Sequence, residues 1–248
     1  MRAPAHNASG FSLVELSIVL VILGLLVGGV LTGQSLIRAA ELRAVTTEAQ
    51  RYAAATQTFR DKYFAIPGDI RNATAFWPTV TTDGDGDGIL DASATPVVEM
   101  FRFWQHLALA GLIEGSFTGV VGGGDAEQHV YSGTGANAPV SKLTNTGWSA
   151  FNRGGDVGGP TGMWTITYGN SFLIGGIDNV GFPDGAGIKP EEAWNIDTKM
   201  DDGKPGTGKV AGFFWTACSN AASETDYAAT YLLSSSAALC HIRFLSAF

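Results

Sequence analysis

The chain has 248 residues, a formal net charge of −8 and 33 glycines. An acidic chain has no electrostatic attraction to a phosphate backbone, so the composition excludes nucleic-acid binding as a default function. The length allows one globular core with additional segments beside it. Hydrophobic residues make up 45% of the chain, and their longest uninterrupted run lies close to the N-terminus.

The N-terminal region is predicted to consist of a polar leader, residues 1–10, followed directly by an apolar segment, residues 11–33. As a helix, residues 11–31 would be about 31 Å long, which matches a hydrocarbon core of about 30 Å. In a secretory signal peptide the apolar region precedes the cleavage site. Here the candidate cleavage site after Gly10 precedes the apolar region. Cleavage there would leave the apolar helix as the new N-terminus.

Residues 10–15 read GFSLVE, and the apolar run continues from there to Leu31. This pattern resembles the processing signature of type IV prepilins and type II secretion pseudopilins. The resemblance implies that a membrane prepilin peptidase cleaves the Gly10–Phe11 bond and methylates the new amine of Phe11. It also implies an inner-membrane assembly platform as a partner and self-association into a helical filament. Before assembly the head would be periplasmic on a single span, and the filament would be periplasmic or on the cell surface.

Glu15 is the one acidic residue of the apolar segment, and a carboxylate near the centre of a membrane helix costs about 2.5–3.5 kcal/mol. After cleavage, Phe11 would carry a positive amine one helical turn before Glu15, on the same face. In a bundle of subunits the carboxylate of one copy can neutralise the amine of the next, which makes Glu15 an assembly residue. The alternative is that Glu15 lies close enough to the helix end to reach water.

The apolar segment also contains two pairs of glycines at GxxxG spacing. These glycines are Gly24, Gly28, Gly29 and Gly33. Each costs about 1 kcal/mol relative to alanine in a helix interior, whereas GxxxG spacing permits close packing of two helices. Whether in a membrane or in a filament, this pattern predicts contact with another helix.

Helical periodicity continues through residues 34–68, and the first proline after the leader is Pro67. A mostly apolar stripe recurs at intervals of three and four residues and predicts an amphipathic helix packed on a globular head. The stripe consists of Leu42, Val45, Ala49, Tyr52, Thr56, Phe59 and Tyr63. Charged residues, Glu48 among them, are assigned to the other faces. Pro67-Gly68-Asp69 is predicted to end a helix of roughly 50 residues.

Residues 69–248 contain all six tryptophans and are predicted to form a loop-rich α+β head with an antiparallel sheet. Helices are expected over residues 97–112 and after Pro190. A hairpin is expected with strands at residues 164–168 and 171–174 around a Gly169-Asn170 turn, and further strands at residues 210–217 and 239–245. Residues 115–160, rich in glycine and small polar residues, are interpreted as a variable surface loop.

The head contains two cysteines, Cys218 and Cys240. In an exported head a disulfide between them is expected, and the chain-entropy model gives it a stabilisation of about 3 kcal/mol. In a cytosolic chain the two thiols would instead be unrelated and reduced. Type IV pilins carry a similar C-terminal disulfide loop, so this pair extends the resemblance to a second, distant region.

A tight acidic loop in the head is the strongest candidate for a metal site. Its aspartates occupy positions 1, 3, 5 and 9 of a glycine-rich stretch, a spacing similar to that of loops that bind Ca²⁺ through oxygen. They are Asp83, Asp85, Asp87 and Asp91. Position 12 is Ala94 in place of the usual glutamate, so Glu99 or a main-chain carbonyl would have to complete the site. The alternative is a solvated acidic turn.

A second and weaker acidic cluster contains Asp197, Asp201 and Asp202. No catalytic constellation is found, because the sequence lacks GxSxG, HExxH, P-loop and dinucleotide-binding motifs and its histidines are scattered. His106 is assigned to the edge of the core. The chain is therefore expected to be a structural pilin or pseudopilin subunit and not an enzyme. The alternative is a minor, tip-located binding module, such as an adhesin or a substrate-capturing head, mounted on the same helix.

Overall fold

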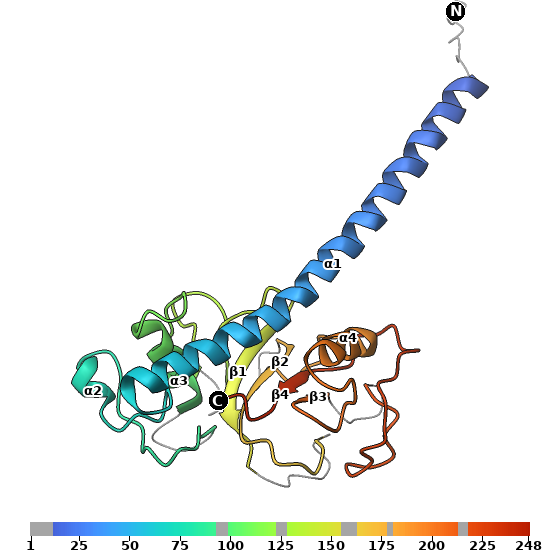
Figure 1. Ribbon diagram of the computed structural model, residues 1–248. Coiled ribbons are helices and arrows are strands. Elements are labelled where there is room, and N and C mark those ends of the chain that lie inside the picture. Colours follow the sequence, from blue (N-terminus) through green and yellow to red (C-terminus); the bar gives the residue numbers. More distant parts are fainter. Residues whose placement is uncertain (1–11, 93–98, 123–127, 155–162, 178–180, 213–217) are drawn as a thin grey trace, which may run out of the picture. The chain divides into compact units, whose positions relative to one another are not determined.

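The structure is a computed structural model that describes residues 12–248 except 93–98, 123–127, 155–162, 178–180 and 213–217. The chain forms two compact units, Met1–Glu41 and Leu42–Phe248. One long helix, α1, begins in the first unit and ends in the second (Figure 1). A four-stranded antiparallel sheet follows this helix, which confirms the predicted α+β class.

Helix α1 spans Leu13–Tyr63, a length of 51 residues, as the uninterrupted periodicity predicted. Its last turn carries Arg60 and Lys62, whose positive charges favour the negative end of the helix dipole. The chain leaves the helix at Phe64, which has a left-handed φ of 56° and donates its N–H to the carbonyl of Arg60 at 2.8 Å. A left-handed residue directly after the last turn commonly ends a helix, and Pro67 prevents it from resuming.

The predicted apolar stripe of α1 is confirmed. Its buried members are Val45, Ala49, Tyr52, Thr56 and Phe59, with Leu42 and Tyr63 partly buried beside them. The assignment of Glu48 to a polar face is wrong, because its exposed fraction is only 5%. Glu48 comes three residues after Val45 and four before Tyr52, and this spacing places all three side chains on one face of the helix.

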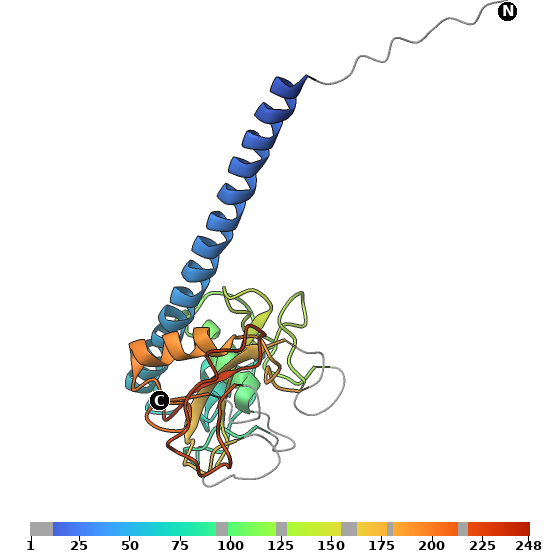
Figure 2. The same ribbon diagram turned by 90° about the vertical axis from the view of Figure 1, so that its right-hand side faces the viewer.

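The sheet has the strand order β1-β2-β4-β3, and every neighbouring pair is antiparallel (Figure 1). Figure 2 shows α1 as one continuous helix in the view turned by 90°. The strands are β1 (Thr146–Asn152), β2 (Asn170–Gly176), β3 (Val210–Gly212) and β4 (Ile242–Phe244). The longest pairing joins β1 to β2, from Thr146 opposite Gly176 to Asn152 opposite Asn170. The last strand of the chain therefore lies between β2 and β3, so the sheet depends on contacts distant in sequence.

Two sequence predictions about this sheet are wrong. Residues 171–174 do not pair with residues 164–168, which form no strand, but with β1 and β4. Strand β1 lies inside residues 115–160, which the sequence assigned to a surface loop, and six of its seven residues are buried. The turn at Gly169-Asn170 favoured a local hairpin, but packing against distant neighbours decides which segments become strands.

The remaining predicted elements are confirmed where the structure describes them. Helix α3 (Glu99–Leu109) lies within residues 97–112, of which 97 and 98 are outside the described residues. Strand β3 begins the segment 210–217, of which 213–217 are likewise outside, and β4 lies within residues 239–245. A short helix, α2 (Ala73–Phe76), had no signal in the sequence.

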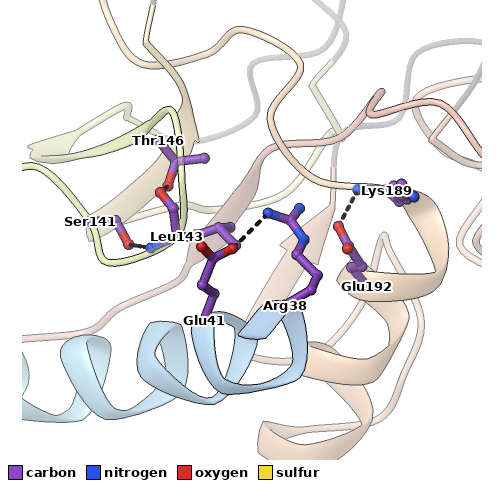
Figure 3. Close-up of polar contacts among 7 residues, drawn as sticks. All are labelled: Arg38, Glu41, Ser141, Leu143, Thr146, Lys189 and Glu192. Carbon is purple, nitrogen blue, oxygen red and sulfur yellow. Dashed lines mark hydrogen bonds and ion pairs between the residues drawn. The ribbon is translucent and has the colours of Figure 1, made fainter. Parts of the chain in front are cut away.

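Helix α4 (Pro190–Met200) begins at the proline that predicted it. Proline suits the first turn of a helix because its missing N–H would have no partner there. The carboxylate of Glu192 accepts the main-chain N–H of Lys189 at 3.0 Å (Figure 3). This bond back to the residue before the helix fixes the point at which the chain enters α4.

Tyr52 of α1 joins three elements of the largest hydrophobic cluster. Its ring centroid lies 4.9 Å from that of Trp104 on α3, 5.4 Å from Trp148 on β1 and 6.1 Å from Phe172 on β2. Such edge-on and tilted pairs are favourable for aromatic rings. The part of α1 that begins at Leu42 is therefore built into the core of the second unit.

Cys218 and Cys240 form a disulfide, which confirms the predicted pairing. Both cysteines are fully buried. Cys240 also pairs through its main chain with Ile188, which lies just before α4. The disulfide therefore joins the segment after β3 to the point where the chain enters β4.

His106 of α3 is fully buried and does not lie at the edge of the core, as the sequence had suggested. Its Nδ1 accepts the N–H of Gly68 at 2.9 Å, and its Nε2 lies 2.8 Å from the hydroxyl of Thr81. Burial lowers the pKa of His106 to about 3, with the nearby charge of Arg102 lowering it further and that of Asp83 opposing. A neutral histidine therefore holds the turn that follows α1.

The free energy of unfolding is expected to fall as the pH is lowered from about 6.5 towards 3. The unfolded chain binds a proton at the ordinary histidine pKa of about 6.5, whereas folded His106 does so only near 3. Urea unfolding of the full-length chain in detergent, followed by tryptophan fluorescence, measures this loss because all six tryptophans lie after residue 68. The variant His106→Gln should lose part of the pH dependence. If the unfolding free energy of His106→Gln depended on pH as steeply as that of the wild type, the prediction would be contradicted.

Candidate functional site

The start of α1 is held by a pair of reciprocal hydrogen bonds. The hydroxyl of Ser12 accepts the N–H of Val14 at 3.2 Å, and the carboxylate of Glu15 accepts the N–H of Ser12 at 2.9 Å. These bonds satisfy two of the N–H groups that the start of a helix leaves without partners. Gly10 and Phe11 lie outside the described residues. In the uncleaved chain, Glu15 thus has a local partner at the beginning of the helix.

The first part of α1 is long and apolar enough to cross a membrane. Its large apolar side chains are exposed, from 86% at Leu13 down to 50% at Val19, and no charged residue occurs between Glu15 and Arg38. Arg38 and Glu41 then form an ion pair at 3.2 Å (Figure 3). A long exposed apolar surface of this kind, bounded by charge, is consistent with a membrane anchor.

The glycines of this apolar stretch face open space. A Cβ atom added at any of the four would meet nothing within 4 Å, and they are Gly24, Gly28, Gly29 and Gly33. Glycine weakens a helix interior, and nothing in the described part of the chain packs against these positions to offset that cost. The absence of side chains at these glycines therefore leaves room for a helix of another molecule to pack closely.

In the acidic loop, the structure assembles a different set of carboxylates from the one the spacing suggested. Asp85 and Asp87 meet Asp69, and one carboxylate oxygen of each lies within 4.8 Å of the other two. Asp83 does not join this group, because its carboxylate accepts the main-chain N–H and the hydroxyl of Thr74 at 2.8 and 2.9 Å. Asp91 does not join it either.

Glu99, proposed to complete the metal site, has another role. It is 1% exposed, and its two oxygens accept the main-chain N–H groups of Asp85 and Asp91 at 3.1 and 3.2 Å. Burial raises the pKa of Glu99 to about 7, the two hydrogen bonds oppose this, and the charges of Asp69 and Asp85 add to it. Glu99 therefore holds the main chain of the acidic loop through its two hydrogen bonds.

Asp69 is the residue of this site that sequence reasoning missed, because Pro67-Gly68-Asp69 was interpreted only as a helix stop. Gly68 has a left-handed φ of 91°, and a Cβ there would lie 2.5 Å from the carbonyl oxygen of Glu99. A Cβ at Gly84 would lie as close to the main chain of Asp69. Glycine at position 68 therefore lets the turn after α1 approach the start of α3, and glycine at position 84 lets the acidic loop approach that turn. The sequence signal that could have pointed to Asp69 was its position directly after the glycine that follows the helix.

The electrostatics of Asp69 reflect its surroundings. Burial raises its pKa to about 6, the N–H groups of Gly88 and Gly86 oppose the shift, and the charges of Asp87 and Asp85 add to it. Like charges that approach closely in a partly dry environment favour protonation or a bound cation. The three carboxylates can therefore act as a cation site.

The second acidic cluster is also assembled, since oxygens of Asp197, Asp201 and Asp202 approach one another within 4.8 Å. Its carboxylates are engaged by protein donors, however. Asp197 accepts the hydroxyl of Tyr231 at 2.8 Å and the N–H of Gly203 at 3.1 Å. Asp202 accepts the N–H of Lys204 and the hydroxyl of Thr207, while Asp201 accepts two main-chain N–H groups. These hydrogen bonds hold the three aspartates at the end of α4 and in the loop that follows it.

Comparison with known proteins gives one match. Residues 5–31 match the family model described as the prokaryotic N-terminal methylation motif, the signature shared by type IV prepilins and pseudopilins. The matched residues include the second half of the predicted leader, the predicted cleavage site and the apolar run of α1 up to Leu31. No curated protein and no solved structure matches the chain.

Proposed function

We propose that this chain, which carries the prepilin signature at residues 5–31, is a structural subunit of a type IV pilus or of a type II secretion pseudopilus. Prepilin peptidase cleaves it between Gly10 and Phe11 and methylates the amine of Phe11. The inner-membrane platform then adds the subunit to a helical filament through the apolar part of α1. The head is periplasmic before assembly, and the filament lies in the periplasm or at the cell surface.

The observation that supports this proposal most is the exposure of the apolar part of α1 and of its glycines. The helix begins at Leu13, within the matched motif, and the side chains of its first part are exposed. A Cβ atom added at any of its four glycines would meet no atom of the described residues within 4 Å. A membrane anchor alone requires only apolar length. Glycines at GxxxG spacing in addition favour close helix packing between subunits.

Processing and assembly test the proposal together. The full-length chain is expressed in a host with a prepilin peptidase and a filament system, and sheared filaments are analysed by mass spectrometry. Filaments are expected to contain a chain that begins with N-methylated Phe11. A Met1 terminus in assembled material would overturn the proposal. The number of copies per filament then separates a major subunit, which is abundant, from a tip-located module, which is rare.

The variant Glu15→Gln separates the two roles of Glu15. A glutamine oxygen can still accept the N–H of Ser12, so the helix start, membrane insertion and cleavage should persist. The negative charge that would pair with the Phe11 amine of a neighbour is lost, so filament counts should fall at least tenfold. Asp61→Asn, which changes an exposed acid on the same helix, is the matched control and should assemble normally. Normal filaments from Glu15→Gln would show that Glu15 serves only to cap the helix.

A further inference from the structure

Three carboxylates from two separate segments converge at the acidic loop. Asp69 comes from the turn after α1, and Asp85 and Asp87 come from the loop that follows α2. One oxygen of each lies within 4.8 Å of the other two. Calcium is bound by oxygens at about 2.3–2.6 Å, so two ligands of one ion are at most about 5 Å apart. The spacing of the three carboxylates therefore suits a single calcium ion between them.

Asp69 gives an independent indication of a missing ligand. It is 3% exposed, and its Oδ2 accepts the N–H of Gly88 at 2.9 Å. Its Oδ1 is buried and has no hydrogen-bond partner among the described residues. A buried carboxylate oxygen without a partner is costly, and a cation at this oxygen would remove that cost.

Each of the other two carboxylates has one oxygen engaged within the loop. Oδ1 of Asp85 accepts the N–H of Asp87 at 3.1 Å, and Oδ1 of Asp87 accepts the N–H of Ile89 at 2.7 Å. Within the described residues, no hydrogen bond reaches the second oxygen of either aspartate. These bonds order the loop while leaving one oxygen on each side chain for a ligand.

No side chain of the described residues neutralises the three charges. Arg71 lies beside the loop, but its Nε donates to the main-chain carbonyl of Asp85 and not to a carboxylate. The one ion pair in the described part of the chain is that of Arg38 and Glu41. A net charge of about −3 in a partly buried site is unfavourable unless protons or a cation compensate it.

The site is accessible from outside. Asp69 lines an open cleft of about 750 Å³, together with Gly86 and Gly88 of the acidic loop. Calcium takes six to eight oxygen ligands and commonly keeps water among them. Water in the cleft can complete the coordination that three carboxylates begin, and an ion can enter the same way.

We propose that Asp69, Asp85 and Asp87 form a calcium site that ties the turn after α1 to the acidic loop. The site differs from the loop-only arrangement suggested by the spacing of Asp83, Asp85, Asp87 and Asp91. It is independent of filament assembly, since every ligand belongs to the second compact unit. Calcium would order the loop by bridging two segments that otherwise repel each other.

Calorimetric titration of the full-length chain in detergent with CaCl₂, after treatment with chelator, tests the proposal. One calcium ion is expected to bind per chain, and saturating calcium should raise the unfolding temperature by several degrees relative to chelator. Asp69→Asn and Asp87→Asn should each weaken binding at least tenfold. Asp83→Asn and Asp201→Asn, matched changes outside the site, should alter the affinity less than threefold.

The thermal stability of Asp69→Asn in chelator separates a ligand from a purely structural residue. Asparagine can still accept the N–H of Gly88 and removes one of three like charges, so this variant should melt no lower than the wild type without calcium. A lower melting temperature in chelator would assign Asp69 to structure alone and overturn its role as a ligand. Loss of binding in Asp83→Asn, with Asp69→Asn unaffected, would restore the loop-only site. No calcium binding to the wild type would exclude the site altogether.

Discussion

Replacing Glu48 with alanine is expected to destabilise the second compact unit by at least about 3 kcal/mol, because each of three buried donors that loses its acceptor costs about 1–3 kcal/mol. Oε2 of Glu48 accepts the indole N–H of Trp148 at 2.8 Å and the hydroxyl of Ser141 at 2.7 Å, and Oε1 accepts the N–H of Lys142 at 3.0 Å. The alanine variant would leave these donors without their acceptor in a dry interior.

The donors that meet Glu48 belong to the turn before β1 and to β1 itself. In that turn the hydroxyl of Ser141 also accepts the N–H of Leu143 at 3.1 Å, and the hydroxyl of Thr146 donates to the carbonyl of Leu143 at 2.8 Å (Figure 3). The carboxylate of Glu48 therefore fixes α1 against an already ordered turn. Its loss should loosen the contact between α1 and the sheet.

Urea unfolding of the full-length chain in detergent, followed by tryptophan fluorescence, measures the effect of Glu48→Ala. Asp61→Ala is the matched control, since Asp61 is an exposed acid on the same helix, and its unfolding midpoint should stay near that of the wild type. Glu48→Gln should fall between the two, because an amide offers one acceptor oxygen where the carboxylate offers two. A loss below about 1 kcal/mol in Glu48→Ala would show that water replaces the carboxylate.

Removing the disulfide with the double variant Cys218→Ala/Cys240→Ala is expected to lower the free energy of unfolding by about 3 kcal/mol. The bond joins positions 22 residues apart, and without it the unfolded chain regains the freedom of that loop. Both cysteines are fully buried, so reductant should act slowly on the folded chain. Alanine removes the sulfur without adding a buried polar group.

The same urea unfolding experiment, performed on the wild type with and without reductant, checks the disulfide prediction. Reduced wild type and the double variant should unfold at similar urea concentrations, both below the oxidised wild type. Ser236→Ala, which changes an exposed residue inside the loop that the disulfide closes and leaves the bond intact, is the control. Equal stability of the double variant and the oxidised wild type would show that the reduced, unfolded chain retains the contacts that the bond enforces.

The sequence by itself determined the features that depend on neighbours along the chain. The length of α1, its apolar stripe and its end before Pro67 follow from periodicity and backbone chemistry within a few residues. The processing motif is linear, so residues 5–31 carry it without any fold. The pairing of Cys218 with Cys240 could be predicted because the chain offers only those two cysteines.

Tertiary structure alone decided the features that depend on partners distant in sequence. Strand β2 pairs with β1 and β4 in place of a local hairpin because its Phe172 is buried against Tyr52 of α1 and Trp104 of α3. Glu48 is buried because the hydrogen bonds of its carboxylate compensate its desolvation, and the donors of these bonds lie about a hundred residues later in the chain. Asp69 joins Asp85 and Asp87 because Gly84 allows the acidic loop to approach the main chain of Asp69. In each case the deciding energy comes from desolvation and hydrogen bonding between segments that no local pattern links.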